Sequence, residues 1–407
     1  MAREMVMTLF PETQAFANRH ADTRAALSVR NLTKRFGEEI VLDDVSFHVA
    51  EGESLVLLGP SGSGKSTTLR IIAGLENPDT GAVILRDREI ENLRARDRNV
   101  GVIFQNYALF PEMTVAENIG FGLKIRGVRA KKRAEVVNKL LTMINLNDQC
   151  DKKPRHLSGG QQQRVAIARA LAYEPDVLLF DESFSALDPH TRVSLRREIR
   201  QLLRDLRVPA LFITHDQEEA LELGDHIAIL NKGRLEQIGT PEEIYNDPQT
   251  EFVATFLGAA NVLSGRWHYG LIRLDNDFFL VPPREVREDE MKEDERVKII
   301  FRPEDVMLNS EVGVAETPYY LGDGEVSEVT FNGATEAVTV RLLNSHLPPQ
   351  KPQLVTSINR AKVVLPGGQE FFVKTLRSKW DAKRMPLAPG DKVAIALKAH
   401  KLLRGDK

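Results

Sequence analysis

Short apolar runs alternate with amphipathic segments through the first two thirds of the chain. The runs hold few charged residues, as is typical of strands buried on both faces of a parallel sheet. Between them, residues 129–146 carry valine, leucine and isoleucine on one helical face. The pattern predicts an α/β domain with a helical subdomain. The predicted strands are residues 54–58, 100–104, 176–180, 210–214 and 225–230, and further helices are predicted after residues 67, 158 and 190.

Past residue 258 the pattern changes to short alternating strands separated by turn residues. Turns are predicted at Asn332-Gly333 and at residues 366–368 and 389–391. Regularly spaced strands with turn signals predict a small all-β barrel. We therefore expect an N-terminal extension over 1–26, an α/β domain over 27–258 and a β-barrel over 259–407. The predicted barrel strands are residues 297–301, 324–331, 337–342, 361–365, 371–375 and 392–397.

Composition limits the functional classes. A chain of 407 residues is too long for one core, and 42% hydrophobic with 28% charged residues is ordinary for globular domains. The net charge of −3 lacks the basic footprint of a nucleic-acid-binding protein. Cys150 is the single cysteine, which excludes an intrachain disulfide framework and favours a reducing compartment. No apolar run approaches the ~20 residues of a membrane helix, and the N-terminus is a poor signal peptide. We expect a soluble chain whose membrane role, if it has one, depends on a partner.

The stretch GPSGSGKST follows one predicted strand and precedes a predicted helix. It fits the phosphate-loop pattern, in which glycines allow a tight turn and backbone N–H groups converge on phosphate oxygens. The helix that follows points its positive end at the same anion. Lys65 would reach the β- and γ-phosphates and Ser66 would ligate Mg²⁺. A chance glycine-rich turn is the alternative, which the flanking elements disfavour. The predicted nucleotide-binding residues are Gly59, Pro60, Ser61, Gly62, Ser63, Gly64, Lys65, Ser66 and Thr67.

A second helix start, LSGGQQQR at residues 157–164, also suits an anion. Ser158 is a good N-cap, and Gly159 and Gly160 allow a phosphate to approach the backbone closely. One nucleotide does not need two such loops from the same chain. The sequence therefore indicates a dimer with shared sites.

Polar residues follow several predicted strands at the edge where α/β sheets bind ligands. Asp181 and Glu182 come directly after residues 176–180, where two acids are costly unless they meet a cation or hydrogen bonds. We expect Asp181 to hold Mg²⁺, largely through water, and Glu182 to orient or deprotonate an attacking water. Gln105 and His215 follow two other predicted strands, and neither residue alone would be strong evidence for a ligand site.

The motifs in this order, LGPSGSGKST, Gln105, LSGGQQQR, LLFDES, SALD and THDQEEA, resemble the ATP-binding subunit of an ABC transporter. The resemblance covers about residues 28–260. It implies an ATPase of the P-loop NTPase fold with ATP and Mg²⁺ as ligands. It also implies that Gln105 links Mg²⁺ and the attacking water to membrane subunits, that Glu182 is the catalytic base and that His215 is the switch histidine.

The resemblance implies further ligand contacts. Phe36 is similar to the adenine-stacking aromatic, although from sequence alone a core or turn aromatic is the commoner reading. Asp188 resembles the aspartate at the dimer seam. The residues Ser158, Gly159, Gly160 and Gln161 belong to the signature that closes over the γ-phosphate of a partner subunit. One departure is visible, because the family commonly has proline where this chain has Ser183.

The C-terminal third has its own resemblance. Residues 301–305 and the ending PLAPGDKVAIALK resemble the OB-like accessory domain that follows some importer ATPases. Such a barrel can bind oligonucleotides, but the stretch lacks an aromatic and basic platform for them. We therefore expect no nucleic-acid partner. A structural role, in dimer support, is favoured over small-anion regulation.

These observations favour the ATPase of an importer. Two copies would sandwich two ATP molecules at the cytoplasmic face of the membrane and drive separate transmembrane permease subunits, served indirectly by a solute-binding protein. The alternatives are a soluble ABC-type ATPase of ribosomes or DNA and an ATP-binding regulator without turnover. Importers with this tail carry sulfate or thiosulfate, molybdate, ferric iron, polyamines or sugars. Residues 94–98 and 256–263 look more similar to the sulfate group.

Overall fold

The structure is a computed structural model of the chain, which divides into two compact units between Ile244 and Tyr245. No helix in the residues given below is long and apolar enough to cross a membrane. The predicted extension up to residue 24, the strand at 361–365 and the turn at 366–368 fall outside those residues. The structure describes residues 25–185, 188–274, 279–280, 282–283, 286–287, 291–309, 319–344 and 371–404.

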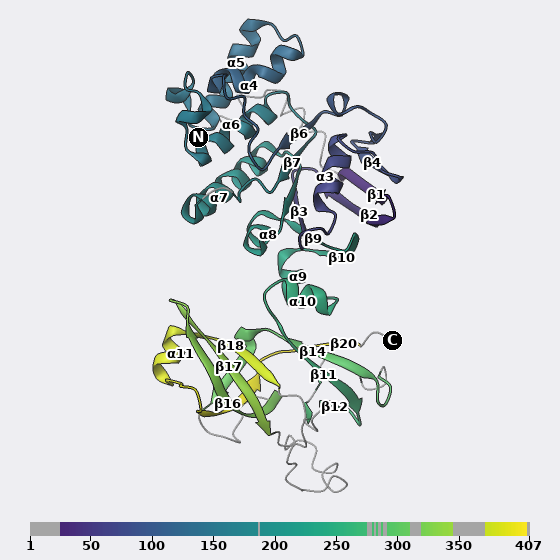
Figure 1. The fold of residues 1–407 in the computed structure, drawn as a ribbon, viewed down its shortest axis with the longest axis vertical. Coiled ribbons are helices and arrows are strands. Elements are labelled where there is room, and N and C mark those ends of the chain that lie inside the picture. Colours follow the sequence, from purple (N-terminus) through teal and green to yellow (C-terminus); the bar gives the residue numbers. More distant parts are fainter. Residues whose placement is uncertain are drawn as a thin grey trace. The chain divides into compact units, whose positions relative to one another are not determined.

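A six-stranded sheet organises the first unit (Figure 1). Its order is β10-β9-β3-β8-β7-β6, and only β10 runs antiparallel to its neighbour. The central strands are buried along their length, as their apolar runs predict. The strands are β3 (Ser54–Leu58), β6 (Val100–Ile103), β7 (Val177–Asp181), β8 (Ala210–Thr214), β9 (His226–Asn231) and β10 (Arg234–Gly239).

A second, antiparallel sheet lies on the other side of helix α3 (Lys65–Ala73) in the first unit. Leu69, Ile71 and Ile72 of this helix are fully buried in one apolar core, to which strands of both sheets contribute. The helix that follows the phosphate loop is therefore fixed between two sheets. The second sheet has the order β2-β1-β4-β5 and contains β1 (Ala25–Phe36), β2 (Glu39–Ala50), β4 (Thr80–Leu85) and β5 (Arg88–Glu89).

Three helices, α4 (Val115–Ile125), α5 (Ala130–Met143) and α6 (Gly159–Leu171), pack together as a helical subdomain (Figure 1). Helices α5 and α6 begin close to their predicted starts, whereas α4 was not predicted. Both α4 and α6 open with a capping box. The α/β expectation is confirmed for the first unit, in which the predicted phosphate loop lies between β3 and α3. The remaining helices of this unit are α7 (Pro189–Leu206) and α8 (Gln217–Leu223), and α9 (Pro241–Asn246) crosses the division between the units.

The second unit is built from two antiparallel five-stranded sheets, β13-β12-β11-β14-β20 and β15-β19-β16-β17-β18. Their inner faces share one apolar core. Five predicted strands are confirmed, but closure into an OB-like barrel stays a prediction. The strands are β11 (Asn261–His268), β12 (Leu271–Leu274), β13 (Phe279–Leu280), β14 (Arg296–Phe301), β15 (Val306–Asn309), β16 (Tyr319–Phe331), β17 (Thr335–Asn344), β18 (Phe372–Ser378), β19 (Lys392–Leu397) and β20 (Lys401–Arg404); α11 (Lys379–Arg384) follows β18.

Arg302 ties the start of the second unit to its sheets. Its buried guanidinium donates to the carbonyls of Tyr245, Ala254 and Leu257 and lies 4.0 Å from the Tyr245 ring centre. Residues 245–257, with α10 (Glu251–Phe256), therefore pack with the C-terminal unit. The compact division thus falls earlier than residue 258, and the domain limits 27–258 and 259–407 stay a prediction.

Candidate functional site

The phosphate loop connects β3 to α3, as predicted. Its last glycine, Gly64, is the N-cap of α3 with a φ of 104°, and no side chain caps the helix there. By contrast, the side chains of Thr114, Ser158 and Asp188 cap the starts of α4, α6 and α7, respectively. The first N–H groups of a helix lack intrahelical partners. The uncapped start of α3 therefore leaves its N–H groups and positive dipole end available to an anion.

Close packing explains two glycines of the loop. A Cβ on Gly59 would lie 2.1 Å from the Leu230 carbonyl oxygen, and one on Gly64 would lie 2.6 Å from Leu42. Gly62 has a φ of 79° but no neighbour within 4 Å of a Cβ. The loop is thus held against β2 and β9 while its outer side stays open. Of the other predicted loop residues, Pro60 accepts a bond from Ser63 N, and Ser61, Ser66 and Thr67 are at least partly exposed.

Lys65 is buried and its ammonium donates to the carbonyls of Gly59 and Pro60, at 2.9 Å each. Burial lowers the pKa of Lys65, whereas the nearby carboxylates of Glu182 and Asp181 oppose that shift. The phosphate loop follows β3 and the two acids lie at the end of β7, and both strands run parallel in the same sheet, so the loop and the acids lie at the same ends of the strands. The three charges predicted for the chemistry therefore belong to one site.

Asp181 ends β7, and Glu182 follows it with a φ of 43°, in the left-handed region. Such a backbone conformation costs energy for a residue with a side chain and persists only where surrounding contacts hold it. Burial raises the pKa of Asp181, and the neighbouring Glu182 carboxylate raises it further. No described residue hydrogen-bonds the Asp181 side chain. A half-buried carboxylate in this setting is suited to a cation.

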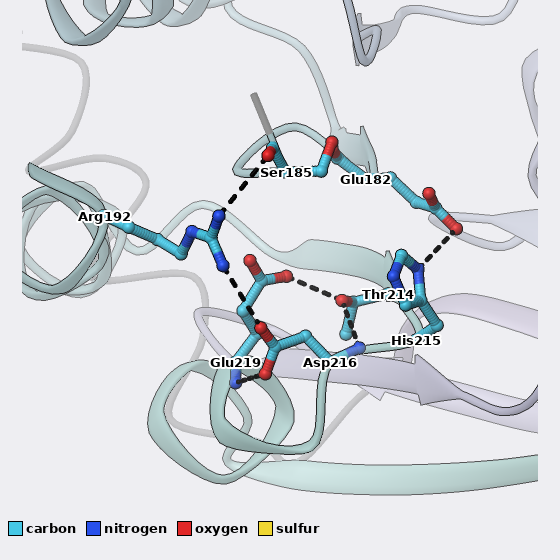
Figure 2. A pocket seen from close by; sticks show the side chains of 7 residues that line it. All are labelled: Glu182, Ser185, Arg192, Thr214, His215, Asp216 and Glu219. Atoms are coloured by element: carbon cyan, nitrogen blue, oxygen red, sulfur yellow. Dashed lines mark hydrogen bonds and ion pairs between the residues drawn. The ribbon is translucent and has the colours of Figure 1, made fainter. Parts of the chain in front are cut away.

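Glu182 and His215 meet across adjacent parallel strands β7 and β8. Nδ1 of His215 lies 3.2 Å from Oε1 of Glu182 (Figure 2). Both side chains line an open hollow of about 130 Å³. The two residues come together because each follows the carboxyl end of its strand, which is where α/β sheets bind ligands.

Five further residues line the same hollow, and sequence reasoning assigned no role to them: Ser185, Arg192, Thr214, Asp216 and Glu219. Thr214 donates to Glu219 at 2.6 Å, and its hydroxyl accepts from the N–H of Asp216 at 3.0 Å. Burial raises the pKa of Glu219. Arg192 of α7 reaches Asp216 at 3.5 Å (Figure 2). Thr214, Asp216 and Glu219 belong to the THDQEEA motif around His215 and could have been found there, whereas nothing in the sequence marks Arg192.

Gln105 follows β6 and donates to the Ser185 hydroxyl at 3.3 Å, which in turn donates to the Glu182 carbonyl at 2.9 Å. The loop after β6 is thereby linked to the segment that carries Glu182. Ser183, the departure from the family pattern, is buried and lies 3.5 Å from Nε2 of Gln163 in α6. Its hydroxyl thus meets an amide in the signature helix.

Phe36 ends β1 and is 49% exposed, so it is not a core residue. The Lys34 ammonium lies 5.0 Å from the ring centre and is itself held by Glu76 at 2.9 Å and by the Asn77 carbonyl at 2.8 Å. The ring is therefore supported from one side by a fixed cation. An exposed aromatic with such support can stack on a base.

The predicted signature residues have structural partners of their own. Ser158 accepts from Gln161 N at 3.3 Å, and Gln161 accepts from Ser158 N at 2.9 Å, so Gln161 closes a capping box. A Cβ on Gly160 would lie 3.1 Å from Cγ2 of Thr191 in α7, so the packing between the two helices is tight at this glycine. Asp188 is exposed and caps α7 through Thr191 N at 3.0 Å; the neighbouring Ala186 and Leu187 are outside the described residues.

The described part of the chain therefore forms one set of contacts around Glu182 and leaves the signature apart from it. Gln105, Ser185, Glu182 and His215 are joined by hydrogen bonds or an ion pair. No such bond joins residues 158–161 to Lys65, Glu182 or His215 among the described residues. That separation is what a shared site between two copies requires.

The oxygen-rich set predicted for a metal fits Mg²⁺, which prefers carboxylate, hydroxyl, amide and water oxygens. Ser66 is exposed on the first turn of α3, Asp181 has an unpaired carboxylate, and Gln105 keeps its amide oxygen outside the bond to Ser185. No cluster of three or more His, Cys, Asp or Glu side chains suited to a metal occurs in the described residues. A soft-metal site is therefore not found there.

The sequence profile of the ABC transporter family matches residues 42–185. A spermidine/putrescine import ATP-binding protein of Oleidesulfovibrio alaskensis is 39% identical over 370 residues, covering 90% of this chain and 94% of that protein. A sulfate/thiosulfate import ATP-binding protein of Vibrio vulnificus is 46% identical over 290 residues, covering 70% and 81%. An ATP-binding cassette solved as a dimer after hydrolysis, with ADP and Pi, is 34% identical with a TM-score of 0.47, covering 53% of this chain and 98% of that one.

Proposed function

Because this chain belongs to the ATP-binding subunits of ABC importers and is an ATPase, we propose that Glu182 and His215 carry its hydrolytic step. The observation that supports this proposal is their contact of 3.2 Å at the ends of adjacent strands. Glu182 deprotonates or orients the water that attacks the γ-phosphate in line. His215 contacts the Glu182 carboxylate through Nδ1 and the γ-phosphate through its other ring nitrogen, Nε2.

The phosphate loop binds the triphosphate of ATP. Backbone N–H groups at the uncapped start of α3 surround the phosphates, and Lys65 moves from two loop carbonyls to the β- and γ-phosphates. Phe36 stacks on the adenine ring. Phosphoryl transfer needs positioning and charge stabilisation more than covalent chemistry, which these fixed groups provide.

Bound Mg²⁺ would neutralise charge that develops on the β- and γ-phosphate oxygens. In this chain Ser66, Gln105 and Asp181 would hold it, the aspartate largely through water. The raised pKa of Asp181 supports this assignment, because a cation would remove the cost of burying its carboxylate beside Glu182.

The complete site requires two copies. Ser158, Gly159, Gly160 and Gln161 of one copy close over the γ-phosphate held by the loop of the other, with Asp188 at the seam. This assignment is supported by the signature sequence itself and by the exposure of Ser158 at the start of α6. The capping box of α6 presents a rigid helix start to that phosphate.

The chain is a peripheral subunit that works with membrane-spanning permease subunits, and we place it at the cytoplasmic face, served indirectly by a solute-binding protein. Sulfate or thiosulfate is the first candidate solute, since several relatives of 46–52% identity are named for it. A polyamine is the second candidate, because the spermidine/putrescine relative aligns over 90% of the chain, which includes most of the C-terminal unit. Sugar, iron and molybdate remain further alternatives.

ATP hydrolysis by the full chain tests the site assignment. We expect Glu182→Gln to bind ATP with unchanged affinity, to remain dimeric with ATP and to lower kcat by about 10²-fold or more. Glu198→Gln on α7, whose carboxylate pairs with Arg164 at the surface, is the matched control and should keep wild-type kcat. Near wild-type turnover in Glu182→Gln would refute its role as the base.

The solute is tested in proteoliposomes that contain the chain with its native permease subunits. The assay measures ATPase stimulation by binding protein loaded with sulfate, with spermidine or with no solute. Stimulation by sulfate alone supports the first candidate, and stimulation by spermidine alone replaces it. ATPase activity that no membrane complex stimulates would favour a non-transport ATPase of this superfamily.

A further inference from the structure

A strained turn follows Gln105. Tyr107 and Ala108 have φ values of 58° and 47°, so two successive residues with side chains adopt the left-handed conformation. Tyr107 is 5% exposed, and its hydroxyl is buried without a hydrogen-bond partner. Conformations of this kind persist only where surrounding contacts hold them.

Arg169 of α6 provides those contacts. Its guanidinium donates to the carbonyl of Ala108 at 2.7 Å and to that of Tyr107 at 2.9 Å. The same group lies 5.7 Å from the ring centre of Phe110. The planar guanidinium donates to both carbonyls through separate N–H groups and lies near the Phe110 ring at the same time, and the single ammonium nitrogen of a lysine does not reproduce this combination. The strained turn is thus bound to one side chain of the signature helix.

The turn lies inside a closed circuit of contacts that begins and ends on α6. Arg169 donates a hydrogen bond to the Ala108 carbonyl, and the backbone of the turn connects Ala108 to Gln105. Gln105 donates to the Ser185 hydroxyl, which donates to the Glu182 carbonyl. The circuit returns to α6 through Ser183 and Gln163. The signature start at Ser158 and Arg169 lie about 16 Å apart along one rigid helix. A shift of the helix start is therefore carried to both catalytic segments.

We propose that Arg169 is a positioning residue, which holds Gln105 against Ser185 and so sets Glu182 according to the position of the signature helix. This inference rests on the proposed function of the same site. It assigns a specific part to a residue outside every motif with a proposed ligand contact. When the hydrogen bonds from Arg169 to the carbonyls of Tyr107 and Ala108 break, the turn returns to an ordinary backbone conformation.

A double-mutant cycle on the full-length chain tests the proposal. At saturating MgATP we expect Arg169→Lys to lower kcat by about three- to thirtyfold, with KM for ATP changed by less than about twofold. In a Gln105→Ala background the same substitution should change kcat by less than about twofold, because its effect passes through Gln105. Arg197→Lys, at an exposed position of α7, is the control with the same chemical change.

Two further variants report on the strain itself. Ala108 is exposed, so substitutions there change the backbone preference with little change in packing. Glycine accepts a positive φ freely, whereas valine does not. We expect Ala108→Gly to restore at least about threefold of the kcat that Arg169→Lys loses, and Ala108→Val alone to lower kcat without raising KM.

Amide hydrogen exchange over residues 104–110 gives a readout that does not depend on hydrolysis. We expect Arg169→Lys to accelerate exchange there by about tenfold and to leave α3 unchanged. Unchanged exchange, an unchanged kcat in Arg169→Lys, or equal losses with and without Gln105 would each overturn the proposal. A wild-type chain without ATPase activity would instead refute the proposed function, and the exchange result would still decide the role of Arg169.

Discussion

His215 lies 3.2 Å from Glu182, and the contact joins two strands that are neighbours in the sheet but distant in the sequence. Each side chain follows the last residue of its strand, where the backbone leaves the sheet. Neither side chain is buried, so both can exchange contacts when a phosphate arrives. The pair therefore has the geometry of a site that is assembled before substrate binds.

Replacement of His215 tests this pair. We expect His215→Ala to lower kcat by about 10²-fold while nucleotide affinity changes little, because Lys65 and the phosphate loop remain intact. The matched control is His226→Ala, because His226 lies 3.5 Å from Glu53 at the opposite edge of the same sheet. Steady-state kinetics of both variants gives the comparison. Equal losses in the two variants would contradict a specific role for His215.

Asp181 provides a pH-dependent prediction. Burial, and then the Glu182 carboxylate, raise the pKa of Asp181, with Arg70 and Lys65 opposing. The ionised carboxylate therefore destabilises the folded chain above the folded-state pKa, and this cost is lost as the pH falls through it. We expect Asp181→Asn to raise the melting temperature in EDTA by roughly 2–4 °C at neutral pH, with a smaller gain in acid.

The same substitution should weaken the Mg²⁺ dependence of nucleotide binding, because the amide offers an oxygen but not the negative charge of a carboxylate near the cation. Melting curves over a pH series, with and without MgATP, measure both effects. A lower melting temperature of Asp181→Asn at neutral pH in EDTA would show that the carboxylate stabilises the free chain and would count against the cation site.

Two glycines of the phosphate loop form a matched pair for substitution. Gly64→Ala places a Cβ 2.6 Å from Leu42 and 2.7 Å from the Val41 carbonyl oxygen at a φ of 104°, whereas Gly62→Ala meets no atom within 4 Å. We expect Gly62→Ala to cost about 1 kcal/mol of folding free energy, from the left-handed backbone alone. Gly64→Ala should cost about 2 kcal/mol or more and should also displace the start of α3.

Urea unfolding measures the first effect, and ATP titration measures the second. We expect ATP affinity to fall at least about tenfold in Gly64→Ala and to fall less in Gly62→Ala, because only Gly64 is packed against β2. The same affinity in both variants would mean that the tight packing of Gly64 does not shape the phosphate site.

The predicted part of this site consists of residues at strand ends and helix starts. Glu182, His215, Gln105 and Lys65 were all predicted from their place after or before an apolar run, since local pattern fixes where a strand ends. Arg192 and Glu219 were not predicted, because they reach the hollow from the faces of α7 and α8, and only the packing of those helices brings them there. Sequence pattern does not determine which helical face meets which loop.

Gly160 and Arg98 show a second limit of prediction from the sequence. Gly160 was predicted to admit a phosphate, whereas its nearest constraint within the chain is Thr191 on the neighbouring helix. The arginines of residues 94–98 were taken to favour a sulfate-type importer, yet Arg98 is buried and binds carbonyls of α3. In both cases the residue contacts a partner that lies far away in the sequence, and the local sequence pattern does not identify that partner.

Arg98 is expected to be a structural residue. Its guanidinium donates to the carbonyls of Ile71 and Ile72 in the last turn of α3 and to those of Glu91 and Leu93. A cation at this end of a helix also interacts favourably with the helix dipole. We expect Arg98→Met to cost about 3 kcal/mol of folding free energy, because it leaves several buried carbonyls unpaired.

The control for Arg98 is Arg96→Met, since the Arg96 side chain is 70% exposed. The urea concentration at the midpoint of unfolding should be the same for Arg96→Met as for the wild-type chain. Neither substitution is expected to change which solute-loaded binding protein stimulates the ATPase in the proteoliposome assay. Altered solute preference in Arg96→Met or Arg98→Met would restore residues 94–98 as a marker of the transported solute.

Arg302 is expected to decide whether residues 245–257 stay with the C-terminal unit. The guanidinium holds the carbonyls of Ala254 and Leu257 at 2.8 Å and 2.6 Å and stacks on Tyr245. Lysine cannot bond several carbonyls and stack on the ring at once. We expect Arg302→Lys to cost about 2 kcal/mol and to expose residues 245–257 to limited proteolysis, while Arg296→Lys at an exposed position of β14 has no effect.

Tyr245 extends this test to alkaline pH. Burial, followed by a hydrogen bond to Glu304, raises the pKa of Tyr245 from 10.0 to about 12. The unfolded chain therefore loses this proton at lower pH than the folded chain, so stability from the tyrosine is present below pH 10 and falls as the pH rises towards 12. We expect Tyr245→Phe to remove that part of the alkaline loss. An identical alkaline unfolding profile in Tyr245→Phe would show that the phenol does not titrate with folding.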